Sequence, residues 1–347
     1  MNKLPLALVL AFLLLTLPLL SFWPPWRYDE SWLGSFAVSV QQQGTFSTPL
    51  FGDAFGFRER ALNRMPLFTL LQAASIQAFG FSLWALRLPS VLCGAAIIAL
   101  FWVICSRWLG KAWAVCGAAL LTFGHLCLME PVNAPGLASL ATDGRYDAAV
   151  AAFGALTAWG ILKAERRRNY RTSILAGAAL GSAILTCPYA LAIVPGVALF
   201  WLTGGRSDPP GMWPRRAATL GAGALIPAPW VAWVAANWET AWPQLDAFDG
   251  SGAPAGLGRL DFASLDFYAS NILREPLRYS GLASCRDPGA VLLAILLCVG
   301  LWKMSQACLM RGRGGRWLAA PEARLSVCWL LCGGLALAAF DSFKTPG

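Results

Sequence analysis

The sequence predicts an all-helical protein that crosses a membrane several times, and two observations lead to this prediction. Hydrophobic residues make up 57% of the 347 residues and charged residues only 13%, whereas soluble domains are about a quarter charged. Apolar runs of roughly twenty residues also recur, and each is long enough for a helix to cross about 30 Å of hydrocarbon. Because backbone polar groups must be satisfied within the lipid, such runs form helices.

We expect about nine membrane-spanning helices. The first, near 4–23, is followed by SFWPPWRY and by no small-residue cleavage site, which indicates a retained anchor rather than a secretory signal. Pro227 and Pro229 predict a kink or the outer end of a later span. Further spans are expected near 86–106, 112–130, 147–163, 172–187, 189–204, 217–236, 288–304 and 324–340.

The short apolar segment 66–80 decides the predicted topology, because it is too short for an ordinary span. If it lies on the membrane surface, sixteen of the 27 basic residues face the cytoplasm, KAERRRNYR (163–171) among them, as the positive-inside rule requires. The chain 1–347 then forms one transmembrane domain with two long outer loops, 24–85 and 237–287. The amphipathic stretch 31–40 predicts a second surface helix in the first loop.

Two functional classes are excluded by charge and by cysteine usage. The net charge of +9 follows from the topology, so it does not indicate a nucleic-acid partner. Most of the ten cysteines fall inside apolar spans, there is one histidine, and no CxxC occurs. A zinc site built from cysteine and histidine is therefore not expected.

Charged residues from distant parts of the chain gather at the predicted outer face. Asp29 and Glu30 follow the first span, Arg64 opens the surface segment, and Arg145 and Asp147 open the span near 147–163. Solvated interface charges are one interpretation, but ionisable residues that run into a span indicate function. Arginine matches phosphate with forked donors, and a carboxylate acts as a general base on a hydroxyl. The pattern favours transfer of a group from a lipid phosphate.

Several motifs resemble one enzyme family. YDESW and QQQGTFSTP (28–49), RMPLFTLLQAASIQAFGFSLWALRLPSVLCG (64–94), GRYDAAVAAF (144–153) and ILAGAALGSAILTCPYALAIVPG (174–196) resemble lipid-linked-sugar glycosyltransferases of the GT-C fold. The pattern is most similar to the dolichyl-phosphate-mannose protein mannosyltransferases and the aminoarabinose transferases. The resemblance implies a GT-C-like helical bundle and transfer of a hexose or pentose, with inversion, from a polyprenyl-phosphate donor.

The resemblance also implies roles for individual residues. Asp29 would be the catalytic carboxylate that takes the acceptor proton, with Glu30 beside it and Asp147 as a second acidic site residue. Arg64 would contact the phosphate, with Arg145 as a further candidate. A divalent metal ion (Mg, Mn or Zn) between Asp29 and Asp147 stays open. The partners would be the sugar donor, a lipid, glycan or protein acceptor, and membrane lipids.

This sequence departs from the family pattern at three places. Arg64-Met65-Pro66 replaces a Lys or His followed by two prolines, and Cys187 stands where the family has a Lys. The family continues with further spans, so we expect the native chain to encode more helices after Gly347.

Other charged residues are weaker candidates. Arg58 belongs to a short charge run that is either a solvated face or a contact to acceptor or phosphate, and Arg274 in the second outer loop is a candidate phosphate contact. The alternative functions are a transporter or flippase, which would keep charges near mid-membrane and often show inverted repeats, and a non-catalytic scaffold. We expect a multi-pass protein of the bacterial inner membrane whose active site faces the periplasm or exterior.

Overall fold

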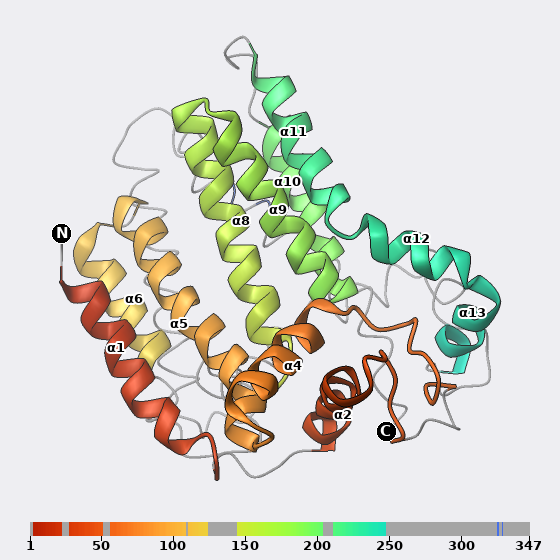
Figure 1. The fold of residues 1–347 in the computed structure, drawn as a ribbon. Coiled ribbons are helices and arrows are strands. Elements are labelled where there is room, and N and C mark those ends of the chain that lie inside the picture. Colours follow the sequence, from red (N-terminus) through yellow and green to blue (C-terminus); the bar gives the residue numbers. More distant parts are fainter. Residues whose placement is uncertain are drawn as a thin grey trace, which may run out of the picture. The chain divides into compact units, whose positions relative to one another are not determined.

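The protein is all-helical in the part that the structure describes. The computed structural model describes residues 3–22, 28–50, 56–108, 110–123, 144–203 and 211–247, together with Leu325 and Cys328. Within these ranges the regular structure consists of helices, and no β-strand occurs (Figure 1). The predicted fold class is confirmed, whereas the spans expected near 288–304 and 324–340 lie outside the described residues, Leu325 and Cys328 excepted.

The chain divides into two compact units. The first contains Met1–Phe123, Gly136–Leu191 and Pro210–Arg259, and all candidate site residues except Arg274 fall within it. The second includes α10 (Ile193–Leu202), reached through the short helix η2 (Pro188–Ala192), and here the Thr203 hydroxyl oxygen lies 3.9 Å from the Cys328 sulfur.

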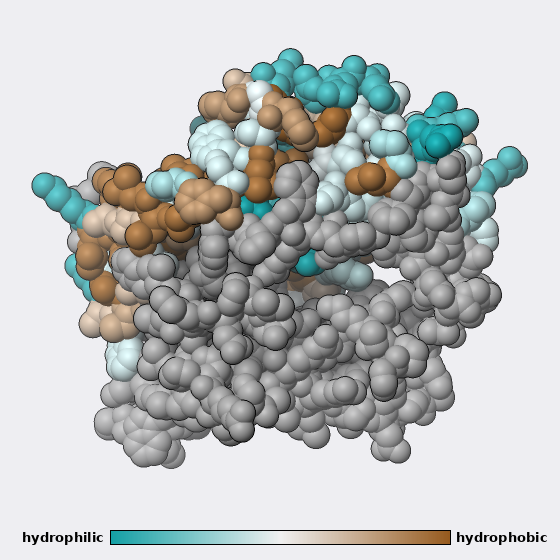
Figure 2. Space-filling model, turned by 90° about the horizontal axis from the view of Figure 1, so that it is seen from below, coloured by the Kyte–Doolittle hydropathy of each residue, from teal (hydrophilic) through white to brown (hydrophobic). Residues whose placement is uncertain are grey.

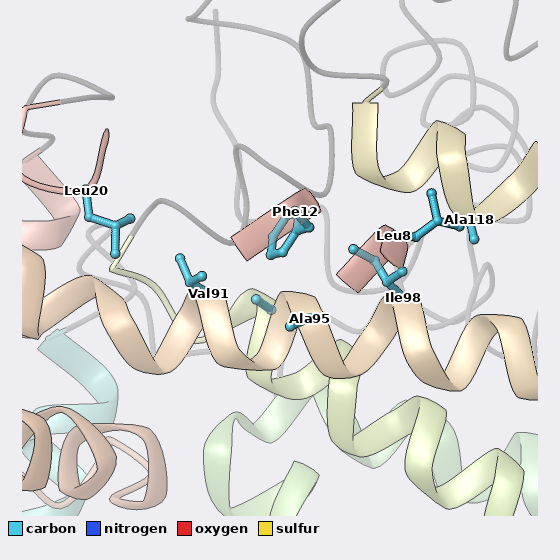
Figure 3. Close-up of a cluster of buried hydrophobic side chains, with 8 residues drawn as sticks. Leu8, Phe12, Leu20, Val91, Ala95, Ile98 and Ala118 are labelled. Carbon is cyan, nitrogen blue, oxygen red and sulfur yellow. The ribbon is translucent and has the colours of Figure 1, made fainter. Parts of the chain in front are cut away.

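Three helices near the N-terminus of the first unit share a hydrophobic core. These are α1 (Leu4–Thr16), which continues into η1 (Leu17–Leu19), α5 (Leu83–Trp108) and α6 (Lys111–Phe123). Figure 3 shows the cluster, in which side chains of α1 and α6 lie over α5; its buried members are Leu8, Phe12, Leu20, Val91, Ala95, Ile98, Ala118 and Ala148. Ala148 belongs to the start of α8 (Asp147–Arg167), so this core also supports the segment that carries Arg145 and Asp147.

Glycines bring the next three helices into close contact. α8 packs against α9 (Tyr170–Thr186), and α9 packs against α11 (Met212–Leu225) (Figure 1). A Cβ atom on Gly177 would lie 2.1 Å from the Thr219 carbonyl oxygen, and one on Gly181 would lie 2.6 Å from that of Gly223. Gly-x-x-x-Gly spacing allows such backbone approach between membrane helices.

Helix lengths support the membrane assignment. Leu83–Arg107 of α5 and Asp147–Arg167 of α8 are long and apolar enough to cross a membrane. A third span is formed if α11 and α12 (Ala228–Ala236) count together, and these are bent by 44° at the break before Pro227, as the prolines predicted. Many large hydrophobic side chains are exposed, among them Leu14, Leu92 and Leu225, and brown hydrophobic areas are prominent on the face in Figure 2.

The predicted surface segments are helices. α2 (Tyr28–Gln43) packs against α4 (Leu67–Phe79), and α4 packs against α5. α4 contains 13 residues and is therefore about 20 Å long, which is shorter than the hydrocarbon layer. Its place relative to the membrane stays a prediction. After α12, the chain continues into α13 (Trp238–Ala247).

Candidate functional site

A buried ion pair joins the beginning of α2 to α5. Glu30 and Arg87 are both fully buried. The Arg87 guanidinium donates through Nη2 to Glu30 Oε2 at 2.7 Å and through Nε to Oε1, and its Nη1 donates to the Leu20 carbonyl at 3.0 Å. This forked, charge-assisted pairing fixes the direction of both side chains. It therefore fixes the first turn of α2, which also contains Asp29.

The same carboxylate holds the segment that leads into α8. The Gly144 N–H donates to Glu30 Oε1 at 2.9 Å, and the Gly144 carbonyl accepts a hydrogen bond of 2.8 Å from Gln72 on α4. A Cβ atom at position 144 would lie 2.9 Å from Glu30 Oε1, so a larger residue there would displace the Glu30 carboxylate. The Ser90 hydroxyl on α5 donates to the Arg145 carbonyl at 3.0 Å. Three helices, α2, α4 and α5, and the segment that precedes α8 thus meet at one polar cluster.

Arg145 and Asp147 form an ion pair where the segment bonded to Glu30 enters α8. Arg145 Nε lies 3.1 Å from Asp147 Oδ2, and the two side chains are 33% and 36% exposed. A pair this exposed contributes little to stability. The pair is thus partly exposed, while the backbone of its segment is held by hydrogen bonds to Ser90 and Glu30.

Arg64 approaches the same place from the first outer loop. Its guanidinium lies over the Trp32 ring, 4.1 Å from the centroid. Burial raises the pKa of the Tyr146 hydroxyl, as do the Cys187 thiol and Asp147, whereas the Arg64 and Arg145 guanidiniums lower it. These groups are therefore electrostatic neighbours. Two guanidiniums, one carboxylate and one phenol therefore lie within electrostatic range of one another, and groups of these kinds suit contact with a phosphate and a hydroxyl.

The structure gives less information on the other predicted site residues. Asp29 lies in the first turn of α2, but its side chain is outside the described part of the chain, as is Arg274. Arg58 is exposed in the turn before Arg64. Among the residues that the structure describes, no group of three or more His, Cys, Asp or Glu could hold a metal ion. The metal site at Asp29 and Asp147 stays a prediction.

The structure adds residues to which the sequence patterns assigned no role. Arg87 lies within the quoted motif ALRLPS, and its position at the start of an apolar span was the available signal, since buried arginines in spans require a partner. Tyr146, Gln72 and Gly144 carried no comparable signal, because tyrosine, glutamine and glycine are common at helix ends. Only the folded chain brings them to Glu30 and Asp147.

Comparison with known proteins agrees with this fold. Residues 63–233 match the model of the dolichyl-phosphate-mannose-protein mannosyltransferase family. The match confirms, for these residues, the resemblance to this family that the sequence motifs indicated. The segment contains Arg64, Arg87, Arg145 and Asp147, and it ends within α12.

Two solved structures also resemble the chain. ArnT from Cupriavidus metallidurans bound to undecaprenyl phosphate matches with a TM-score of 0.55 and 18% identity over 98% of this chain. The apo form of the same protein matches with a TM-score of 0.51 and 17% identity over 97% of this chain. The chain spans 61% and 59% of the two ArnT chains. Curated proteins contain no match to the chain by sequence. The chain therefore has the predicted GT-C-like fold of a polytopic membrane protein.

Proposed function

We propose that this protein is a glycosyltransferase that moves a sugar from a polyprenyl-phosphate donor to the hydroxyl of a lipid, glycan or protein acceptor at the extracytoplasmic face. The observation that carries the proposal is the Arg145–Asp147 pair at the start of α8, whose segment is bonded to Glu30 and Ser90. Arg64 is an electrostatic neighbour of this pair through Tyr146. The family match over residues 63–233 supports it, as does the fold shared with an ArnT that binds undecaprenyl phosphate.

The arrangement suits a displacement at the anomeric carbon. The acceptor oxygen attacks that carbon while a carboxylate, assigned to Asp29, takes the hydroxyl proton. The bond between the anomeric carbon and the phosphate oxygen breaks, and polyprenyl phosphate leaves with the electron pair. Arg64 and Arg145 would offset the negative charge that develops on this phosphate. The configuration at the anomeric carbon inverts.

Glu30 has a different part in this proposal. Both of its carboxylate oxygens accept hydrogen bonds from Arg87, and Oε1 also accepts one from Gly144. Because Glu30 is fully buried, its carboxylate is not within direct hydrogen-bond reach of an acceptor hydroxyl at the surface. Glu30 therefore acts as a positioning residue for Asp29 and for the start of α8. No step of the proposed reaction uses a metal ion, and a divalent ion between Asp29 and Asp147 stays a prediction from the sequence.

The proposal is tested with purified full-length protein, an undecaprenyl-phosphate sugar and a lipid acceptor. Asp29→Asn keeps the size of the side chain but removes the base, so the turnover should fall by about 10²–10⁴, while undecaprenyl phosphate still binds. Arg64→Ala should instead weaken binding of undecaprenyl phosphate and slow the transfer. Transfer by Asp29→Asn at the wild-type rate would contradict the assignment of the base, and Asp147 would replace it.

A further inference from the structure

We propose that Gln244, in the second predicted outer loop, is a positioning residue that holds the segment 56–63 and thereby the phosphate-contacting Arg64. The proposal deepens the proposed function and rests on it for the role of Arg64. Gln244 lies 182 residues after Leu62 in sequence, and it is 1% exposed. A buried amide side chain is costly unless its donors and acceptor are satisfied.

All hydrogen-bonding groups of the Gln244 side chain are used by this one segment. Its Nε2 donates to the carbonyl of Gly56 at 2.8 Å and to that of Arg60 at 2.6 Å. Its Oε1 accepts from the Leu62 N–H at 2.7 Å. The Asn63 side-chain amide donates to the Gln244 main-chain carbonyl at 3.2 Å. The segment is therefore bonded to Gln244 at both ends and at its middle.

The opposite side of segment 56–63 is fixed to the region after α2. Thr48 N–H donates to the Phe57 carbonyl at 3.0 Å, and Ala61 N–H donates to the Phe46 carbonyl at 2.7 Å. Gly56 has φ +67°, a conformation that glycine adopts without strain and that turns its carbonyl towards Gln244. Arg64 follows Asn63 directly, so the position of its backbone is set by these bonds.

A second contact joins the same two regions at the start of α13. Arg60 Nη1 donates to Asn237 Oδ1 at 3.1 Å, at the joint between α12 and α13. This bond is exposed and is expected to contribute little, whereas the Gln244 bonds are buried. Buried polar contacts of this kind specify one arrangement of the chain rather than adding much net stability. Gln244 therefore links the second outer loop to the candidate phosphate site.

The first arm of the test measures the segment itself and needs no activity. Gln244→Leu keeps the approximate volume of the side chain and removes its three hydrogen bonds. Residue-resolved hydrogen–deuterium exchange should then show an acceleration of about tenfold or more at the Leu62 amide. The amide of Ala114, which donates to the Gly110 carbonyl at the start of α6 and not to segment 56–63, serves as an internal reference. Gln244→Glu keeps the acceptor for Leu62 but would place a buried carboxylate oxygen against the Gly56 and Arg60 carbonyls, so it should also accelerate exchange at Leu62.

The second arm measures binding of undecaprenyl phosphate, with undecaprenol as the probe that lacks the phosphate. Gln244→Leu should weaken binding of undecaprenyl phosphate by about three- to tenfold and leave binding of undecaprenol unchanged. In an Arg64→Ala background, Gln244→Leu should cause no further loss. Thr240→Ala, on the exposed side of α13, is the matched control and should behave as wild type in both arms.

The outcomes separate this inference from the function on which it rests. Unchanged exchange at Leu62 in Gln244→Leu would overturn the inference, as would losses that simply add in the double variant. If Arg64→Ala itself binds undecaprenyl phosphate normally, the proposed role of Arg64 fails. In that case, faster exchange of the Leu62 amide in Gln244→Leu would still support the conclusion that Gln244 fixes segment 56–63.

Discussion

Between α9 and α11 the closest contacts join backbone to backbone, whereas around Glu30 they are made through polar side chains. Gly177 and Gly181 let α9 approach the carbonyls of α11. Around Glu30 the elements are held by a buried ion pair and by amide and hydroxyl side chains such as Gln72 and Ser90. Both regions are buried, yet different forces hold them.

The difference follows from what each region must satisfy. Within a span the helix satisfies its own backbone, so neighbouring helices gain most from close packing of small residues. Where chains enter or leave a helix, backbone groups have no partner within the element, and side chains must supply one. The polar region is therefore the one in which a single substitution changes the geometry of the site, while the glycine-lined region mainly sets stability.

The largest effect is expected for Glu30→Gln. The amide cannot neutralise Arg87, and loss of one partner from a buried pair costs about 3–5 kcal/mol of unfolding free energy. Thermal unfolding of the purified protein measures this loss. The double variant Glu30→Leu with Arg87→Leu removes both charges and should recover most of the stability. A double variant as unstable as Glu30→Gln would show that the charge imbalance is not the cause.

Gly177→Ala should have the next largest effect, and it tests the glycine-lined region. The new methyl group would meet the Thr219 carbonyl, which belongs to a helix backbone and cannot move aside. We expect a loss of about 1–3 kcal/mol in thermal or denaturant unfolding. Gly221→Ala on α11 is the control, because no atom lies within 4 Å of its added Cβ. Equal losses in the two variants would contradict the proposed helix contact.

A smaller effect is expected on the pH dependence of stability when Tyr146 is replaced. Its pKa is raised, chiefly by burial, so the phenol stays neutral in the folded protein while it ionises near pH 10 in the unfolded chain. Stability from this group is complete below pH 10 and falls above it, by up to about 1.4 kcal/mol per pH unit. Melting temperatures between pH 9 and 11.5 should therefore decline less steeply in Tyr146→Phe. Identical slopes would place the Tyr146 hydroxyl in water.

The smallest effect is expected for the contact between Arg64 and Trp32. Cation–π interactions contribute about 0.5–1 kcal/mol at partly exposed sites, so Trp32→Leu should weaken binding of undecaprenyl phosphate by about two- to fivefold. Trp32→Phe keeps an aromatic face and should lose less. Should the leucine variant bind as tightly as wild type, Arg64 is held by its loop alone.

The sequence by itself determined the membrane character, the helical class and much of the helix placement. Apolar runs and the positions of prolines are local properties, and they were enough to predict α5, α8 and the bend before Pro227. The motifs between residues 64 and 196 were enough to indicate a resemblance to the glycosyltransferase family whose model matches residues 63–233. The acids and arginines expected at one face were also chosen from local features, since charges at the ends of spans are conspicuous in an apolar chain.

Only the tertiary structure decided which of these charged residues pair with one another and which of them are buried. Glu30 was expected beside the catalytic carboxylate Asp29, but folding pairs it with Arg87, 57 residues away. Gln244 had no visible role until folding placed it against Leu62, 182 residues away. Hydrogen bonds and ion pairs between distant residues depend on how helices pack, and helical periodicity records only which face is buried and not what that face meets. The assignment of roles among similar side chains therefore came from the fold.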